Sequence, residues 1–220
     1  MLRTTLLTLA AATWLLAAAA QVDPRAQADL EELRARYESG GALQADVQLE
    51  IELPDQPAEV QRGRIVQDGE RFRVEFAGQH VISDGETVWM FLPDNLEVQV
   101  YDAAEGAGLA DGGFMRPQDI LAMYESGEFE YAITAEPTED GVALRQIEFK
   151  PTDRDSEFAK IRLTYDPAAD EVRRVRVFNK DGSRFALSMA AVQTGGEVAP
   201  ATFVFDESDY PGVSVEDMRL

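Results

Sequence analysis

The sequence contains no cysteine, and histidine and lysine are scarce: there is one histidine, and the lysines are Lys150, Lys160 and Lys180. The absence of cysteine excludes disulfide bonds, thiolate nucleophiles and thiolate metal ligands. It also excludes the lipid anchor that some exported proteins carry on an N-terminal cysteine. We therefore expect a free protein rather than an anchored one.

Positive charge is also in short supply. The chain has 41 acidic residues against 20 basic ones, which gives a formal net charge of −21. Nucleic acids and anionic membrane surfaces would repel such a chain, so neither is an expected partner. An acidic surface of this kind favours solubility, and it would also suit a salt-rich habitat.

Residues 1–20 have the pattern of a secretory signal peptide. Arg3 supplies a basic start, residues 6–16 are apolar, and residues 18–20 are three alanines that fit a cleavage site. The alternative, a transmembrane helix, is disfavoured because the apolar run is barely long enough and is rich in alanine. We expect cleavage near Ala20 and a soluble exported protein with a single domain at residues 21–220.

Strand patterns dominate the rest of the chain. Apolar and polar residues alternate from Leu43 to Leu53, after an amphipathic helix predicted at 24–39 with Asp23 as its cap. Asp-Gly pairs, which are typical of hairpin turns, begin at residues 68, 84, 140 and 181. We predict an antiparallel meander of about ten strands, curled strongly to bury its apolar face. Beside residues 43–53 and 81–101, the predicted strands are 58–67, 71–77, 130–135, 142–150, 158–166, 171–179, 183–193 and 202–206.

Residues 81–101 predict two strands between tight turns at Asp84-Gly85 and at residues 93–95. Residues 87–92 are apolar on both faces of their strand, so both faces need cover. Residues 103–129 are the candidate cover, because they open with a Gly-rich stretch and continue into a helix from about Pro117. We predict that this segment is a hinged lid.

No catalytic constellation stands out. His80, Ser83 and Asp84 are close in sequence, but adjacent strand residues alternate faces and no G-x-S-x-G elbow is present. Residues 153–155 begin like a calcium loop but lack its glycine and its terminal glutamate. We therefore predict no enzymatic activity, no metal site and no cofactor.

The surplus of large apolar side chains, the hinged lid and export favour a container for a hydrophobic ligand. Each methylene that a ligand buries contributes roughly 0.8 kcal/mol, so an apolar lining alone can hold a long acyl chain. The alternative is that the same side chains simply fill a closed core. Periodicity does not decide between these two interpretations.

The stretch SDGETVWMF at residues 83–91 resembles the S-D-G-x-T-x-W segment of the LolA-type outer-membrane lipoprotein carriers. The similarity continues through Phe-Met at 114–115 and Phe-Lys-Pro at 149–151, and it is clearest at residues 203–205 and 212–219. These segments occur in the same order along essentially the whole mature chain. The resemblance is therefore more specific than any one short motif.

The resemblance implies an incomplete, strongly curved antiparallel β-barrel, closed by a helical lid over an apolar cavity. It implies a monomeric periplasmic carrier that takes acylated lipoproteins from an inner-membrane ABC-type releasing complex to the outer membrane. Whether an outer-membrane receptor takes part is left open. Two alternatives also remain, a carrier of another apolar lipid and a regulatory module that senses mislocalised lipoproteins.

Candidate lipid-binding positions combine the alternation with the resemblance. Phe72 matches an aromatic residue of the family's concave sheet, and 114–121 fall in its lid. The predicted lipid-binding residues are Val47, Leu49, Ile51, Phe72, Val74, Phe76, Trp89, Phe91, Val98, Phe114, Met115, Ile120, Leu121 and Tyr124.

One departure concerns the lid. Proteobacterial members of the family have a Lys-Arg-Pro whose arginine holds the lid shut, and this chain has Gln-Asp-Gly at 67–69 instead. Arg64, Arg71 and Arg73 are the candidates for the replacement.

Overall fold

The computed structural model describes residues 23–103, 120–121 and 123–219, and it is built around one large sheet. A separate two-stranded sheet joins β8 (Thr138–Glu139) to β9 (Val142–Ala143). The strands of the large sheet are β1 (Leu43–Glu52), β2 (Glu59–Asp68), β3 (Arg71–Phe76), β4 (Gln79–Ser83), β5 (Thr87–Leu92), β6 (Glu97–Asp102), β7 (Phe129–Ala135), β10 (Arg145–Pro151), β11 (Phe158–Asp166), β12 (Glu171–Asn179), β13 (Arg184–Thr194) and β14 (Ser214–Asp217).

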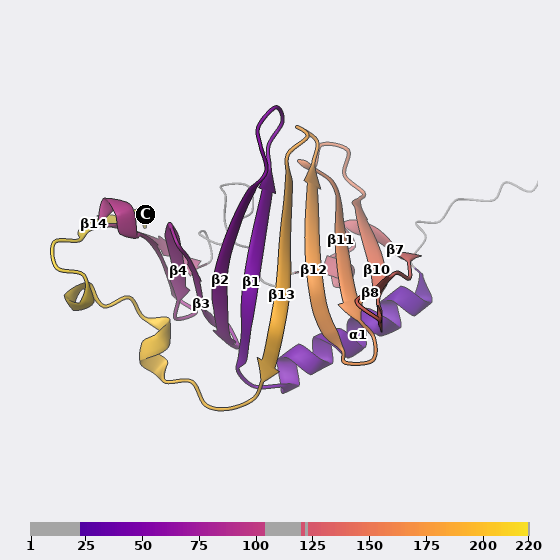
Figure 1. The fold of residues 1–220 in the computed structure, drawn as a ribbon, viewed down its shortest axis with the longest axis horizontal. Coiled ribbons are helices and arrows are strands. Elements are labelled where there is room, and N and C mark those ends of the chain that lie inside the picture. Colours follow the sequence, from indigo (N-terminus) through magenta and orange to yellow (C-terminus); the bar gives the residue numbers. More distant parts are fainter. Residues whose placement is uncertain (1–22, 104–119, 122, 220) are drawn as a thin grey trace, which may run out of the picture.

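The order of the strands across the sheet is β14-β6-β5-β4-β3-β2-β1-β13-β12-β11-β10-β7. β14 and β7 lie at the two edges, so the twelve strands form a curved open sheet that does not close into a barrel (Figure 1). All neighbours pair antiparallel except β14 and β6, which are parallel. The predicted fold class, a mainly β protein with an incomplete barrel, is confirmed.

The predicted N-terminal helix is confirmed as α1 (Pro24–Ser39). The Asp23 side chain accepts a hydrogen bond from the Arg25 backbone N–H at 2.9 Å, and Pro24 occupies the first helical position. α1 runs across one face of β13, β12, β11, β10 and β7 (Figure 1), and it buries Ala26, Leu30 and Leu33 there. We call this face of the sheet the inner face and the opposite one the outer face.

The four predicted Asp-Gly turns are confirmed. They join β2 to β3, β4 to β5, β8 to β9 and β12 to β13. The glycine has a positive φ in each turn, between 59° and 99°, and such angles are strained for any residue with a Cβ. The turn chemistry was therefore readable from the sequence alone.

Three strand predictions need correction. Residues 202–206 are not a strand: the 3₁₀ helix η4 (Pro200–Phe203) overlaps them, and Pro200 has no N–H to donate to a ladder. The predicted strand 142–150 is divided at Leu144 into β9, in the small sheet, and β10, in the large one. The Leu144 backbone N–H donates to the Pro137 carbonyl instead of to a neighbouring strand of the large sheet. The sheet also has more than ten strands, since β14 adds a parallel edge strand that carries no alternating apolar pattern.

The outer face of β4, β5 and β6 is covered by the segment that follows β13. Phe205, with Tyr210 and Val213 beside it, packs against Ile82, Phe91 and Val98 in a second apolar cluster. The predicted double cover of β5 is thus present, since Val88 belongs to the inner cluster and Phe91 to the outer one. Among the described residues, the cover of the outer face comes from the C-terminal segment.

Polar contacts tie α1 to the sheet along its whole length. Asp23 accepts from the Ile133 N–H at 3.2 Å, and the Tyr37 hydroxyl accepts from the Val172 N–H at 3.1 Å. Between them, Arg145 Nη1 donates to both Asp29 carboxylate oxygens at 2.9 and 3.0 Å, and the Tyr165 hydroxyl donates to the same carboxylate. Burial, followed by the neighbouring Asp29 carboxylate, raises the pKa of Tyr165, so its hydroxyl stays a donor.

Replacing Asp29 with asparagine should weaken the hold of the sheet on α1. The asparagine amide has no negative charge and a single acceptor oxygen, so it cannot replace the carboxylate that accepts from Arg145 and Tyr165. We therefore expect the free energy of unfolding to fall by about 1–3 kcal/mol. Denaturant unfolding monitored by circular dichroism measures this change. The matched control is Glu32→Gln on the exposed side of the same helix, expected to change stability by less than about 0.5 kcal/mol. Equal effects of the two variants would contradict the anchor.

His80, the single histidine, lies on the outer face beside the second cluster. Its ring meets Phe91 edge-on at 5.6 Å, and its Nδ1 is buried with no hydrogen-bond partner among the described residues. Burial lowers the pKa of His80, opposed by the negative charge of Glu75 and assisted by the positive charge of Arg73. The neutral ring is therefore the form that fits the folded protein.

The pH dependence of stability should report this histidine. Folding lowers the pKa of His80, so as the pH falls the unfolded chain takes up the proton before the folded one does. The contribution of the neutral ring to the free energy of unfolding is therefore complete above about pH 6.5 and is lost below it. One proton limits the slope to about 1.4 kcal/mol per pH unit. Unfolding titrations between about pH 7 and 5 should show this loss in the natural protein and not in His80→Phe. A slope that survives in His80→Phe would contradict the assignment.

Candidate functional site

The inner face of the sheet is a continuous apolar surface. Cross-strand pairing places one row of side chains from β7 to β13 next to each other: Tyr131, Phe149, Ile161, Val177 and Phe185. The first four are buried in the main apolar cluster and Phe185 packs against it. This row packs in the same cluster as Ala26, Leu30 and Leu33 of α1, so the inner face is filled at this place.

Burial along β1 is uneven, and this gives the apolar surface a direction. Leu43 and Val47 are buried near the end where α1 crosses, with exposed fractions of 4% and 3%. Leu49 and Ile51 are half-buried, and Leu53 is 39% exposed. The inner face is therefore closed at the α1 end and becomes open toward the β1–β2 hairpin, which projects at the top of Figure 1.

The described part of the second half of the predicted lid, residues 120–121 and 123–125, adds cover to the inner face. Ile120 and Leu121 are 1% and 0% exposed within the main cluster, and Tyr124 of the 3₁₀ helix η3 (Met123–Glu125) meets Tyr131 edge-on at 6.3 Å. We call Ile120, Leu121 and η3 the covering segment. Its polar link to α1 is an ion pair between Arg34 and Glu125. The core of the predicted lid at 104–119 lies outside the described residues.

Most predicted lipid-binding residues come together on the inner face. Leu49 and Tyr124 pack against the main cluster, and Ile51 is half-buried opposite Phe185. Phe114 and Met115 lie outside the described residues. The predicted residues buried in the main cluster are Val47, Phe72, Val74, Phe76, Ile120 and Leu121.

Trp89, Phe91 and Val98 lie apart from this group, on the outer face. Phe91 stands 4.3 Å from Tyr210 and 5.2 Å from Phe205 between ring centroids, beneath the C-terminal segment. Both faces of β5 are apolar, so the sequence did not reveal which set of side chains points inward. The structure does not bring these three residues to the surface that the other predicted residues form.

Sequence reasoning missed the inner-face residues of β7 and β10 to β13. Phe149 alternates with Glu148 and Lys150, and Val175 and Val177 alternate with arginines. That alternation is the signal that would have found them.

The three arginines considered as lid latches all point to the outer face. Arg64 lies 3.9 Å from the Asp46 carboxylate, and Arg71 stacks over the Phe203 ring at 5.0 Å. Arg73 pairs with Glu75 at 2.6 Å and donates to the Thr202 carbonyl at 3.4 Å. Arg71 and Arg73 therefore help to hold the C-terminal segment, and among the described residues Arg34 is the arginine paired with the covering segment.

Two other kinds of site were sought in the described part of the chain. It holds no group of three or more His, Asp or Glu side chains that could bind a metal ion. No helix within it is long and apolar enough to cross a membrane.

Comparisons with known proteins agree with this geometry. The family model for the outer membrane lipoprotein carrier protein LolA matches residues 55–206. An outer-membrane lipoprotein carrier protein from Methylobacillus flagellatus is 25% identical over 181 residues, which cover 80% of this chain and 83% of that protein.

Solved structures support the same fold at lower identity. An uncharacterized conserved protein from Thermus thermophilus is similar with a TM-score of 0.57 and 13% identity, over 88% of this chain and 99% of that one. A crystal structure of MucB has a TM-score of 0.50 and 14% identity, over 84% of this chain and 65% of that one. At such identities these two structures establish the fold alone. Because the family model matches more than half of the length of this chain, the chain belongs to the LolA family of outer membrane lipoprotein carrier proteins.

Proposed function

We propose that the protein is a periplasmic carrier that binds the acyl chains of lipoproteins on its inner face and moves them from the inner to the outer membrane. The observation that carries the proposal is the apolar strip that starts buried at Leu43 of β1 and ends exposed at Leu53, in the hairpin directly after β1. A filled core would close this strip at both ends. A half-open strip suits a ligand that enters from the hairpin end.

The covering segment is the part of the described chain best suited to give way to cargo. The side chains of Arg34 and Glu125 are 32% and 55% exposed, so solvent screens their ion pair and it contributes little to stability. Ile120 and Leu121 make apolar contacts that an acyl chain could replace in kind. α1, held at three places by hydrogen bonds, is instead a fixed wall.

The remaining parts of the proposal concern partners and export. The cargo is acylated lipoprotein, the donor an inner-membrane ABC-type releasing complex, and the acceptor the outer membrane with or without a receptor. Binding needs no enzymatic step and no cofactor, because burial of methylene groups supplies the free energy. A signal peptide at residues 1–20 would direct export.

Replacing Leu49 with glutamate should impair binding of a synthetic triacylated lipopeptide. The half-buried Leu49 faces the proposed binding surface, and a carboxylate there must lose water when an acyl chain arrives. We expect at least about a tenfold rise in Kd, measured by calorimetry.

The matched control is Gln48→Glu, which adds the same charge one residue away on the outer face of the same strand. It should leave the Kd within about twofold. Equal losses in the two variants would contradict an inner-face binding site.

Native mass spectrometry of the protein purified from its own cells tests the cargo. We expect a one-to-one complex with triacylated lipoprotein. Bound free lipids would instead favour a carrier of another apolar molecule. A protein that is empty, and stays empty after incubation with lipoprotein, would mean that the inner face is only a filled core.

A further inference from the structure

The outer face of β10 to β13 has a charge opposite to that of the rest of the chain. Three carboxylates lie on the outer face of these strands: Glu148, which is buried, and Asp166 and Glu171, which meet where β11 ends and β12 begins and both pair with Arg173 at 3.2 Å. Over the whole chain, by contrast, acidic residues outnumber basic ones by 41 to 20. The cations on this face, which we call the basic face, are Lys150, Lys160, Arg162, Arg174, Arg176 and Arg184.

The cations of the basic face are held in fixed positions. Lys160, Arg162 and Arg184 surround the Phe178 ring at 5.2, 5.0 and 6.0 Å from its centroid. Lys160 and Arg162 also pair with Glu148 at 3.1 and 2.8 Å. Because these contacts already order the three side chains, little side-chain entropy is lost when a ligand binds to them. Their side chains are 29–54% exposed, so some of their N–H donors remain available to a ligand.

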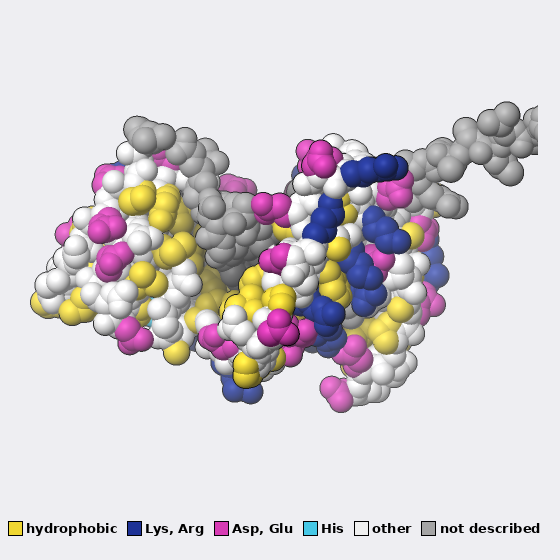
Figure 2. Space-filling model, turned by 90° about the horizontal axis from the view of Figure 1, so that it is seen from above, with side chains coloured by type: hydrophobic (Ala, Val, Ile, Leu, Met, Phe, Trp, Pro, Cys, Tyr) yellow, Lys and Arg dark blue, Asp and Glu magenta, His cyan; other side chains and the backbone are white. Residues whose placement is uncertain are grey.

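The carboxylates that partly balance this face come from its borders. Arg174 pairs with Glu139 of β8 at 2.7 Å, and Arg184 pairs with Glu52 of β1 at 3.2 Å. Arg176 lies 3.6 Å from Glu50, and its Nε is buried without a hydrogen-bond partner among the described residues. The centre of the face therefore keeps an excess of positive charge. In Figure 2, Lys and Arg side chains gather over the half of the molecule in which Figure 1 places these strands.

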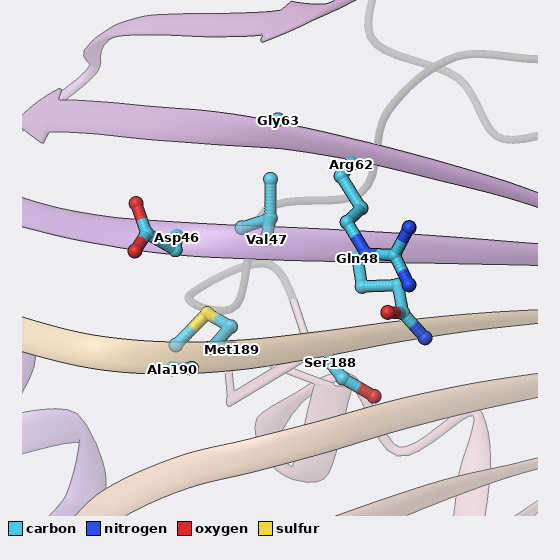
Figure 3. Close-up of a pocket in the computed structure, with 8 residues that line it drawn as sticks. All are labelled: Asp46, Val47, Gln48, Arg62, Gly63, Ser188, Met189 and Ala190. Carbon is cyan, nitrogen blue, oxygen red and sulfur yellow. The ribbon is translucent and has the colours of Figure 1, made fainter.

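A cavity of about 420 Å³ continues the basic face across β13, β1 and β2. Pairing puts Ser188, Gln48 and Arg62 side by side on the outer face, next to Arg174 in the same row. Figure 3 shows these polar side chains around the cavity. Hydroxyl, amide and guanidinium groups are hydrogen-bond donors, so this end of the cavity suits an anionic group. The Asp46 carboxylate lines the other end of the cavity (Figure 3) and lies 3.9 Å from Arg64.

We propose that the basic face and this cavity are the docking site for an acidic segment of a partner protein. Arginine forks at strand spacing match carboxylates better than isolated lysines do, and four of the six cations are arginines. A bilayer of anionic lipid is a poorer occupant because its extended plane would also repel the acidic remainder of the chain. An acidic segment touches the basic face alone.

A partner on this face would leave the inner face free. α1, the covering segment and the half-open strip of β1 all lie on the opposite side of the sheet. The carrier could therefore be held by its partner while the inner face exchanges cargo. The docking site itself does not depend on the identity of the cargo, so it can be tested with empty protein.

The test uses a fluorescent decaglutamate peptide and anisotropy at low salt and at about 0.15 M salt. The face variant carries Arg62→Gln, Arg174→Gln and Arg184→Gln. The control variant carries Arg25→Gln, Arg36→Gln and Arg219→Gln at exposed positions away from the face. Both variants lose three positive charges, so any effect of net charge alone is the same in each.

We expect the peptide to bind the natural protein at low salt, with affinity falling at higher salt. The face variant should bind about tenfold more weakly, and the control variant within about twofold of the natural protein. Circular dichroism checks that both variants are folded. No binding at low salt, or equal losses in the two variants, would overturn the proposal. Binding of phosphatidylglycerol vesicles, but not of the peptide, through the same arginines would assign the face to a membrane instead.

Discussion

Alternation of side chains along β-strands is the constraint on which the rest of this structure depends. Each strand sends successive residues to opposite faces, so one sheet must carry two surfaces of different chemistry. On β10 the order Ile147, Glu148, Phe149, Lys150 places two buried apolar groups inward and two charged groups outward. On β10 to β13 an apolar inner face therefore comes together with a charged outer face, whereas on β4 to β6 the outer face is apolar and is covered by the C-terminal segment.

The two faces are covered at opposite ends of the sheet. α1 covers the inner face of β7 and β10 to β13, whereas the C-terminal segment covers the outer face of β4 to β6. This diagonal arrangement leaves the outer face of β10 to β13 free of any described segment and leaves the hairpin end of β1 half-open. The two surfaces proposed here as binding sites are the ones that this covering leaves accessible.

Local features of the fold could be predicted from the sequence, and long-range ones could not. The helix capped by Asp23 and the Asp-Gly turns depend on neighbouring residues alone. The direction of Phe91 depends on Tyr210 and Phe205, more than a hundred residues away, because either face of an apolar strand can be buried. Likewise no local signal shows that Asp29 meets Arg145, or that 202–206 packs across strands instead of joining them.

A carrier must bind its cargo and also release it. This is easier when one side of the binding surface is held firmly and another side is held by contacts that the cargo can replace. In this protein the fixed wall and the yielding one differ in the kind of contact that holds them. α1 is held by the half-buried Asp29 carboxylate, which accepts from Arg145 and Tyr165, and breaking these contacts would leave charged and polar groups without partners. The covering segment is held by an exposed ion pair and by Ile120 and Leu121, whose apolar contacts an acyl chain can replace at little net cost. In the carrier that we propose, exchange of one apolar group for another would let cargo enter and leave without a large change in free energy.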